Sequence, residues 1–173
     1  MSITLFAVLT IACGLSSAAP TLGGAAVPVP HVRPLDAGAR DDIRNGLLQS
    51  PTLAQLNREL AASHVVVYLR WNAFLATRGR LVYVAHANGT TYLLAEIASR
   101  QTATARIAVI AHELEHAVEA DRAPSLTSDA DFTRWFRCVG YETHPGAADT
   151  DAARDVERRV LAEASSARRR SLP

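Results

Sequence analysis

The chain has 173 residues, which is the size of one typical domain with a hydrophobic core of its own. Its 18 basic and 17 acidic residues leave a net charge of +1, so no strong electrostatic field favours nucleic acid. No segment interleaves aromatic with basic residues either, and we therefore exclude nucleic acid as a partner.

An uncharged apolar segment stands near the start of the sequence, ITLFAVLTIACGLSSAA, and its last residues are small. This pattern is typical of a secretory signal peptide, with cleavage expected after Ala19 or as late as Ala26. Cys13 leaves lipidation open as an alternative. The apolar run is shorter than the ~20 residues that span a bilayer, so we expect no stable membrane insertion once the signal is removed. These features predict a secreted or periplasmic protein.

The rest of the sequence divides by composition. The stretch after the signal is rich in proline and predicts a flexible segment before the folded domain. The expected segments are a signal peptide at 1–19, a Pro-rich flexible segment at 20–38, a domain at 39–167 and a basic tail at 168–173.

Cap and turn signals define the elements in the first half of the domain. Residues 41–48 favour a helix, and SPTLAQLNRELAAS favours a second one, because Ser50 can cap it and Pro51 suits its first turn. The β-branched run from His64 to Arg70 predicts a strand. The segment GRLVYVAHANGTTYLLAEIA predicts two strands joined by a hairpin turn at Asn88-Gly89.

The second half of the domain is mostly helical. A long helix is expected from Thr104 to Asp121, and a short one follows, capped by Thr127 or Ser128 and ended by Gly140. The segment YETHPGAADT predicts a loop. A last helix is expected from Asp151 to Ala164, with a narrow apolar stripe. Together the elements predict an α+β domain with a small, mostly antiparallel sheet packed on a long helix and further helices.

The long helix carries the most specific motif of the chain, AVIAHELEHAVEAD, in which His112 and His116 flank Glu113 in the order H-E-x-x-H. The two histidines are one turn apart, about 6 Å along the axis, so both imidazoles can bind one ion. Glu113 lies about 100° around the helix, where its carboxylate can take a proton from a water at an open metal position. A chance match in a core helix is the alternative. About one such pentad is expected in a hundred chains of this composition, and the helical setting after a hairpin favours a metal site.

At this motif the chain resembles the zincin metallopeptidases. The segments VVVYLR, YLLAEI, IAHELEHAVE and YET together resemble, more narrowly, a group of small exported bacterial proteins that carry the same pentad. The likeness runs from about Ser63 to Glu163. It implies a minimal zincin-like fold, in which strands lead into the motif helix, and a zinc-dependent hydrolase whose substrate it does not supply.

A catalytic zinc site takes three protein ligands and keeps one position open. Glu142, 26 residues beyond His116, resembles the downstream glutamate of the gluzincin branch, and we predict that it is the third ligand. The E-x-x-x-D pattern of that branch is broken, because Gly146 stands at the aspartate position. Asp149 or Asp151 is then expected to take the role of that aspartate.

Two other residues remain alternatives for the third ligand. Glu119 lies in the last turn of the motif helix, where the helix dipole disfavours negative charge. A role as a ligand or as a partner of a ligand would explain it, and so would pairing with Arg122 in solvent. His144 is close to Glu142 in sequence and could ligate the ion or hydrogen-bond a reacting oxyanion.

Two functions compete on these grounds. The first is a zinc-dependent peptidase that acts on a peptide or protein substrate, with Glu113 activating water at a zinc ion held by His112, His116 and Glu142. The substrate would then lie extended along the sheet edge as an added strand. The second is an exported, non-catalytic metal-binding or scaffold module on a zincin-like fold.

Overall fold

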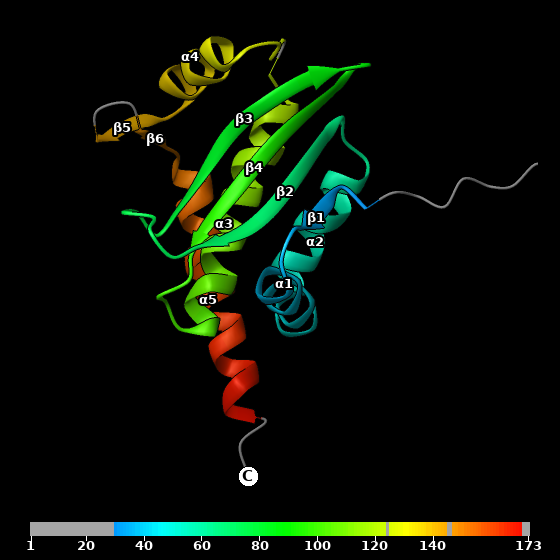
Figure 1. The fold of residues 1–173 in the computed structure, drawn as a ribbon. Coiled ribbons are helices and arrows are strands. Elements are labelled where there is room, and N and C mark those ends of the chain that lie inside the picture. The colour runs from blue at the N-terminus through cyan, green and yellow to red at the C-terminus, as the bar shows by residue number, and fades with distance from the viewer. Residues whose placement is uncertain (1–29, 124, 145–146, 171–173) are drawn as a thin grey trace, which may run out of the picture.

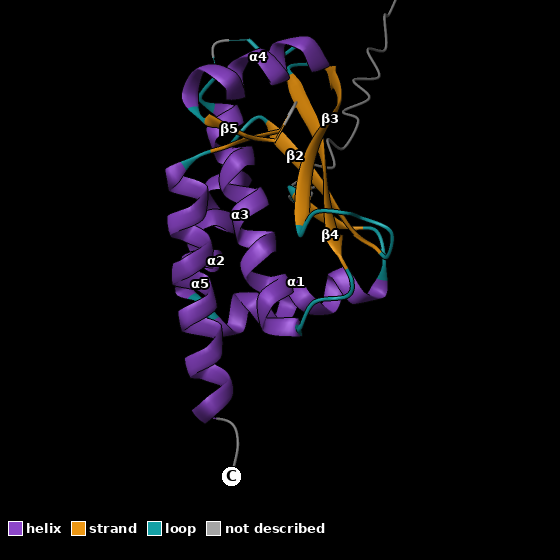
Figure 2. Cartoon of the chain, turned by 90° about the vertical axis from the view of Figure 1, so that its left-hand side faces the viewer, coloured by secondary structure: helices purple, strands orange, loops and turns teal. Residues whose placement is uncertain are grey.

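The computed structural model describes residues 30–123, 125–144 and 147–170. Within these residues the chain forms five helices, a four-stranded sheet and a two-stranded sheet, so the fold class is α+β as predicted. Figure 1 shows the four-stranded sheet in front of the long helix α3, and Figure 2 shows the strands to one side of α3 and α5. The domain is therefore a layer of strands packed on a layer of helices.

The helices are α1 (Ala37–Gln49), α2 (Pro51–Ala61), α3 (Ala103–Asp121), α4 (Asp129–Val139) and α5 (Asp151–Arg170). The strands are β1 (Val32–Pro34), β2 (Val65–Asn72), β3 (Gly79–Ala87), β4 (Thr90–Ala98), β5 (Tyr141–His144) and β6 (Ala147–Asp149). The helices predicted at 41–48, 104–121 and 151–164 are all present, and each is longer than expected.

The main sheet is mixed, with strand order β1-β2-β4-β3. β3 and β4 form the predicted antiparallel hairpin, with Asn88 and Gly89 at φ angles of 52° and 73°. β2, however, pairs in parallel with both β1 and β4. The prediction of a mostly antiparallel sheet is therefore wrong for this sheet. β4 lies between β2 and β3, so β2 and β3 are consecutive in sequence but are not neighbours in the sheet.

β1 also corrects the prediction for residues 20–38. Residues 32–34 pair with residues 67–69 of β2, and Val32 is buried. Pro34 is tolerated because β1 is an edge strand. Residues 20–29 and the expected signal peptide lie outside the described residues, as do residues 171–173 of the expected tail, whereas 168–170 continue α5. None of the described helices has the length and hydropathy needed to cross a bilayer.

Side-chain caps determine where four of the helices begin. Asp36, Ser50, Thr102 and Ser128 each accept a hydrogen bond from the backbone N–H three residues further on. Ser50 was predicted for this role. Thr102 fixes the first turn of α3 and thereby the register of the H-E-x-x-H motif on the helix.

α3 lies at the centre of the core, where it packs against the sheet, α1, α2 and α5. Its apolar stripe is buried, as is the predicted stripe of α5 that packs on it: Ile107, Ala111, Leu114 and Val118 of α3, and Ala153, Val156, Val160 and Ala164 of α5. Burial from several sides fixes the position of α3 and so limits the freedom of the side chains that it carries.

The segment predicted as a loop after α4 contains an antiparallel hairpin, β5 with β6, so that prediction is wrong. Gly140 permits the close approach of the two strands, because a Cβ at this position would lie 2.3 Å from the backbone oxygen of Asp149. The hairpin lies beside α4 in Figure 1 and leads directly into α5. It thus carries the chain from α4 back to α3.

Candidate metal centre

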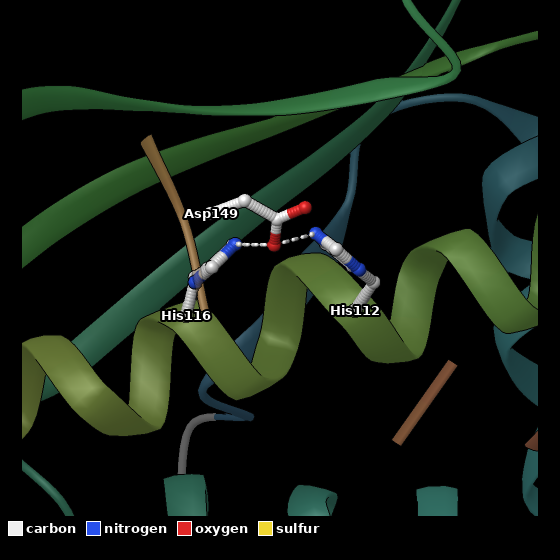
Figure 3. A group of neighbouring side chains, drawn as sticks. All are labelled: His112, His116 and Asp149. Atoms are coloured by element: carbon white, nitrogen blue, oxygen red, sulfur yellow. Dashed lines mark ion pairs between the residues drawn. The ribbon is translucent and has the colours of Figure 1, made fainter. Parts of the chain in front are cut away.

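His112 and His116 project from α3 toward one carboxylate, that of Asp149 (Figure 3). The Nε2 atom of His112 is 3.4 Å from Oδ1 of Asp149, and the Nε2 atom of His116 is 3.7 Å from the same oxygen. One ligand atom from each residue lies within 4.8 Å of the other two. The three residues are therefore placed to bind a metal ion.

Asp149 is oriented by the start of α5. It is the last residue of β6, and the next residue, Thr150, accepts a hydrogen bond from the backbone N–H of Ala153 and so caps the helix. Oδ1 of Asp149 accepts the backbone N–H of Thr150 at 2.8 Å, and Oδ2 accepts Nε–H of Arg154 at 2.7 Å. The guanidinium of Arg154 also lies 4.9 Å from the ring centroid of Tyr141. These contacts hold the carboxylate above the imidazoles.

The donor atoms fit zinc. Zinc binds histidine nitrogen at about 2.0–2.1 Å and carboxylate oxygen at about 2.0–2.2 Å, which puts the ligand atoms of a tetrahedral site about 3.3–3.5 Å apart. The separations of 3.4 and 3.7 Å between the Nε2 atoms and Oδ1 are close to this range. Imidazole and carboxylate also suit other first-row metals, so these residues define a metal site without defining the metal.

Glu119 fixes the ring of His116 from the other side. The Nδ1 atom of His116 donates to Oε2 of Glu119 at 2.8 Å, and both side chains are nearly buried. Because the Nδ1 proton is held by Glu119, Nε2 is the nitrogen that remains for a metal. Of the roles considered for Glu119, the structure has it as the hydrogen-bond partner of His116.

Glu157 of α5 lies behind His112. Its Oε2 atom is 3.2 Å from Nδ1 of His112, but the two atoms are not aligned for a hydrogen bond, and within the described residues this Nδ1 has no hydrogen-bond partner. The contact is therefore a close approach of the carboxylate to the ring nitrogen and not a hydrogen bond. Oε1 of Glu157 lies 2.6 Å from Nη2 of Arg78, the residue just before β3.

The cluster carries more negative than positive charge. Four carboxylates surround the two imidazoles, namely those of Glu113, Glu119, Asp149 and Glu157. Two guanidiniums contact these carboxylates, Arg154 at Asp149 and Arg78 at Glu157. With neutral imidazoles and ionised carboxylates, the excess is two negative charges, which a divalent cation would balance.

The protonation of the metal-free cluster follows from this excess. Burial alone would lower the pKa of His116, but its contacts with Asp149 and Glu119 outweigh burial and raise the pKa to about 9. Burial likewise would raise the pKa of Asp149, but His116 and Arg154 hold it well below its usual range. Without a metal, the proton on His116 therefore supplies part of the missing positive charge.

Glu113 lies beneath the first residue of β3. It is 4% exposed, and a Cβ on Gly79 would lie 2.5 Å from its Oε1 atom. Burial raises the pKa of Glu113 more than the nearby His116 and His112 lower it. A carboxylate with a raised pKa is a better proton acceptor at neutral pH than an ordinary glutamate.

A cleft of about 1210 Å³ contains these residues. It is lined by residues 79–83 of the edge strand β3 and by residues of α4, the β5–β6 hairpin and α5. His112, Glu113 and His116 of α3 also line it. The residues placed to bind a metal and Glu113 thus line one common cleft.

His112, His116 and Glu113 line one cleft, and the structure places Asp149, and not Glu142, with the imidazoles. Glu142 pairs with Ala148, whereas Tyr141 pairs with Asp149. Because neighbouring residues of a strand face opposite sides, Glu142 lies on the other face of the hairpin from Asp149. Glu142 still lines the cleft, and its side chain is exposed.

The outcome differs for the other candidate residues. The side chain of His144 lies outside the described part of the chain. Asp149 was predicted only as a substitute for the aspartate of the E-x-x-x-D pattern. Glu157 was missed altogether, although it lies four residues after Ala153 in the buried stripe and next to Val156, so its helix position gave a signal.

Comparisons of the chain with protein-family models, with curated proteins and with solved structures found no match.

Proposed function

We propose that this protein is a zinc-dependent hydrolase of the zincin type, acting on peptide bonds, in which His112, His116 and Asp149 hold the metal. The convergence of two Nε2 atoms and one carboxylate oxygen in an open cleft carries the proposal. The excess of carboxylates over guanidiniums around this point supports a divalent cation.

The proposed reaction needs a group that polarises the carbonyl and a group that transfers the proton. Zinc, when bound, would act as a Lewis acid toward the scissile carbonyl. Glu113 takes a proton from the attacking water and returns it to the leaving amine. Its position supports this role, because the buried carboxylate lines the same cleft as the two imidazoles.

The sheet edge supports an extended peptide as the substrate. β3 is an edge strand of the described sheet, and its residues 79–83 line the cleft. An extended peptide can hydrogen-bond to such an edge as an additional strand. This would place a backbone amide of the peptide above Glu113 and the imidazoles.

A structural metal in a non-catalytic module is the second candidate. Asp149 and α3 are far apart in sequence, so a shared metal would tie the β5–β6 hairpin to the core. Structural zinc sites, however, have four protein ligands, whereas three residues form the group in the described chain. The cleft beside this group also favours catalysis.

Metal content and a matched pair of variants test the proposal. Purified full chain should bind about one equivalent of zinc and hydrolyse a mixture of unfolded peptides, with new amino termini detected by mass spectrometry. Glu113→Gln should retain zinc and lose at least ~100-fold of the activity, because the proton acceptor is gone. Glu115→Gln, on the same helix and also buried, is the control and should retain both. Failure of the wild-type chain to take up zinc would overturn the proposal, and hydrolysis unaffected by Glu113→Gln would remove its mechanism.

A further inference from the structure

Each imidazole of the metal centre has a carboxylate at the nitrogen that faces away from Asp149. Glu119 contacts Nδ1 of His116, and Glu157 contacts Nδ1 of His112. The two carboxylates come from different elements, since Glu119 is on α3 itself and Glu157 is on α5. The pattern is thus not a by-product of one helical spacing.

Neither carboxylate is where a glutamate would be placed for stability alone. Glu119 lies in the last turn of α3, where the helix dipole disfavours negative charge, and its side chain is only 13% exposed. Glu157 is 18% exposed and packed between α5 and α3. Burial of charge at these positions costs free energy that the contacts with the rings, and for Glu157 also the ion pair with Arg78, offset.

Arg78 adds a third member on the His112 side. Its Nη2 atom lies 2.6 Å from Oε1 of Glu157. The side chain of Gln101 donates to the backbone oxygen of Arg78 at 2.8 Å and accepts from Nε of Arg78 at 3.3 Å. Glu157 is therefore fixed from the strand side as well as by its own helix. Arg78 directly precedes Gly79, so the start of the edge strand is linked to His112 through Glu157.

We infer that Glu119 and Glu157 are positioning residues, which hold the two imidazoles with Nε2 directed at one metal, and that Arg78 holds Glu157 in place. The inference rests on the proposed function, because it requires that the imidazoles bind a metal. Carboxylates on the outer nitrogen of a ligating histidine orient the ring and increase its basicity. Glu119 should orient its imidazole more strongly than Glu157 does, because Glu119 makes a hydrogen bond at 2.8 Å, whereas Glu157 makes an unaligned contact at 3.2 Å.

Zinc titration of the full chain against a competing chelator tests this, with Zn²⁺ alone as the probe. Glu119→Ala should weaken zinc binding ~10–100-fold and Glu157→Ala about 10-fold. Glu115→Ala is the control, because the described structure brings its carboxylate into no hydrogen bond or ion pair with either ring, and it should change affinity less than ~2-fold. Arg78→Gln should weaken binding in the wild-type background but add nothing to Glu157→Ala.

A second readout separates positioning from a general loss of stability. In the Co²⁺-loaded protein, paramagnetic proton NMR resolves the exchangeable Nδ1 protons of ligating histidines. Glu119→Ala should speed the exchange of one of these protons and leave the other unchanged, which a mere loss of stability would not do. If Glu119→Ala does not fold, Glu119→Gln carries the test and should bind zinc several-fold more weakly than wild type, since its amide oxygen is a weaker acceptor than a carboxylate.

The outcomes distinguish this inference from the proposed function. Zinc binding by the wild type with unchanged affinity in the Glu119 variants overturns the positioning role and leaves the hydrolase proposal intact. Absence of zinc binding by the wild type overturns both. Additive losses for Arg78→Gln and Glu157→Ala would overturn the role of Arg78.

Discussion

Two clusters of charged side chains lie on opposite faces of the main sheet, and they balance buried carboxylates in different ways. Glu96 of β4 is 1% exposed and contacts Arg70, Arg80 and Asn72. It lies away from α3, because strand neighbours alternate and Ala95 and Ile97 are in the core. The metal centre lies on the helix side, where carboxylates gather around two imidazoles.

The difference lies in where the positive charge comes from. Burial would raise the pKa of Glu96, but hydrogen bonds from Arg70 and Arg80 outweigh burial and lower it, so that cluster is complete within the chain. The metal centre has fewer guanidiniums than carboxylates and takes up a proton at His116 when no cation is present. A buried cluster whose carboxylates outnumber its guanidiniums is thus a better indicator of a cation site than a cluster that merely contains many charged groups.

The largest expected effect concerns the ligand that distinguishes the two clusters. Asp149→Ala should weaken zinc binding by more than the ~100-fold expected for a residue that only supports a ligand. Glu142→Ala is the matched control on the other face of the same hairpin and should change affinity less than ~10-fold. Chelator competition measures both, and the opposite ranking would restore Glu142 as the third ligand.

Gly79 should matter to catalysis and not to metal binding. In Gly79→Ala the new Cβ would meet Oε1 of Glu113 and a methyl group of Val109, each at 2.5 Å, so the carboxylate or the strand must move. A displacement of about 1 Å at a catalytic group can cost ~100-fold in rate, so kcat should fall by about this factor with zinc affinity retained.

Gly46→Ala is the control for that experiment. The added Cβ meets Leu53 at a similar distance of 2.5 Å, but within the helical core and away from the cleft. It should alter thermal stability without altering kcat per folded molecule. Equal kcat in Gly79→Ala and wild type would show that Glu113 does not depend on this contact.

Zinc should stabilise the fold by binding at the cluster of His112, His116 and Asp149 and not at the Glu96 cluster. At a free zinc concentration of 100 Kd, the free energy of unfolding should rise by ~2.7 kcal/mol, which for a domain of this size is a shift of about 5–10 °C in Tm. Glu96→Gln should keep this zinc-dependent shift, and Asp149→Ala should lose it. Thermal melts with zinc and with chelator would show this, and a shift that survives Asp149→Ala would place the metal elsewhere.

The smallest effect is the pH dependence of the Glu96 cluster. Because the folded-state pKa of Glu96 is lowered from 4.5, its contribution is fully present above that value and is lost as the pH falls through the folded pKa. Glu96→Gln should cost about 1–3 kcal/mol at neutral pH and flatten the loss of stability below pH 4.5. Urea unfolding between pH 3 and 7 measures it, and an equally steep acid loss in the variant would contradict the assignment.

Local signals were sufficient to predict the helices and the hairpin. The Ser50 cap of α2, the apolar stripe of α5 and the Asn88-Gly89 turn are properties of contiguous residues, and all are present in the structure. The H-E-x-x-H spacing likewise brings His112 and His116 together within one helix. These features could be predicted because helix periodicity acts over a few residues.

Long-range pairing could not be predicted in this way. The insertion of β4 between β2 and β3 depends on how whole strands pack on α3. β5 and β6 are short and mostly polar, so they show no alternation of apolar residues. The choice between Glu142 and Asp149 depends on a register with an irregularity after Glu142, and a shift of one residue exchanges the two faces.

The irregular register of β3 has a consequence for self-association. An edge strand offers unpaired backbone groups to any extended chain, including a second copy of the same protein. Here a register shift interrupts the pairing of β3 with β4 between Tyr83 and Ala85, and residues of α4, the β5–β6 hairpin and α5 line the same cleft as residues 79–83. We expect these elements to hinder the approach of a folded domain to this part of the edge more than that of a single extended segment. We therefore expect this part of the edge to be less open to sheet-to-sheet aggregation than a bare edge strand.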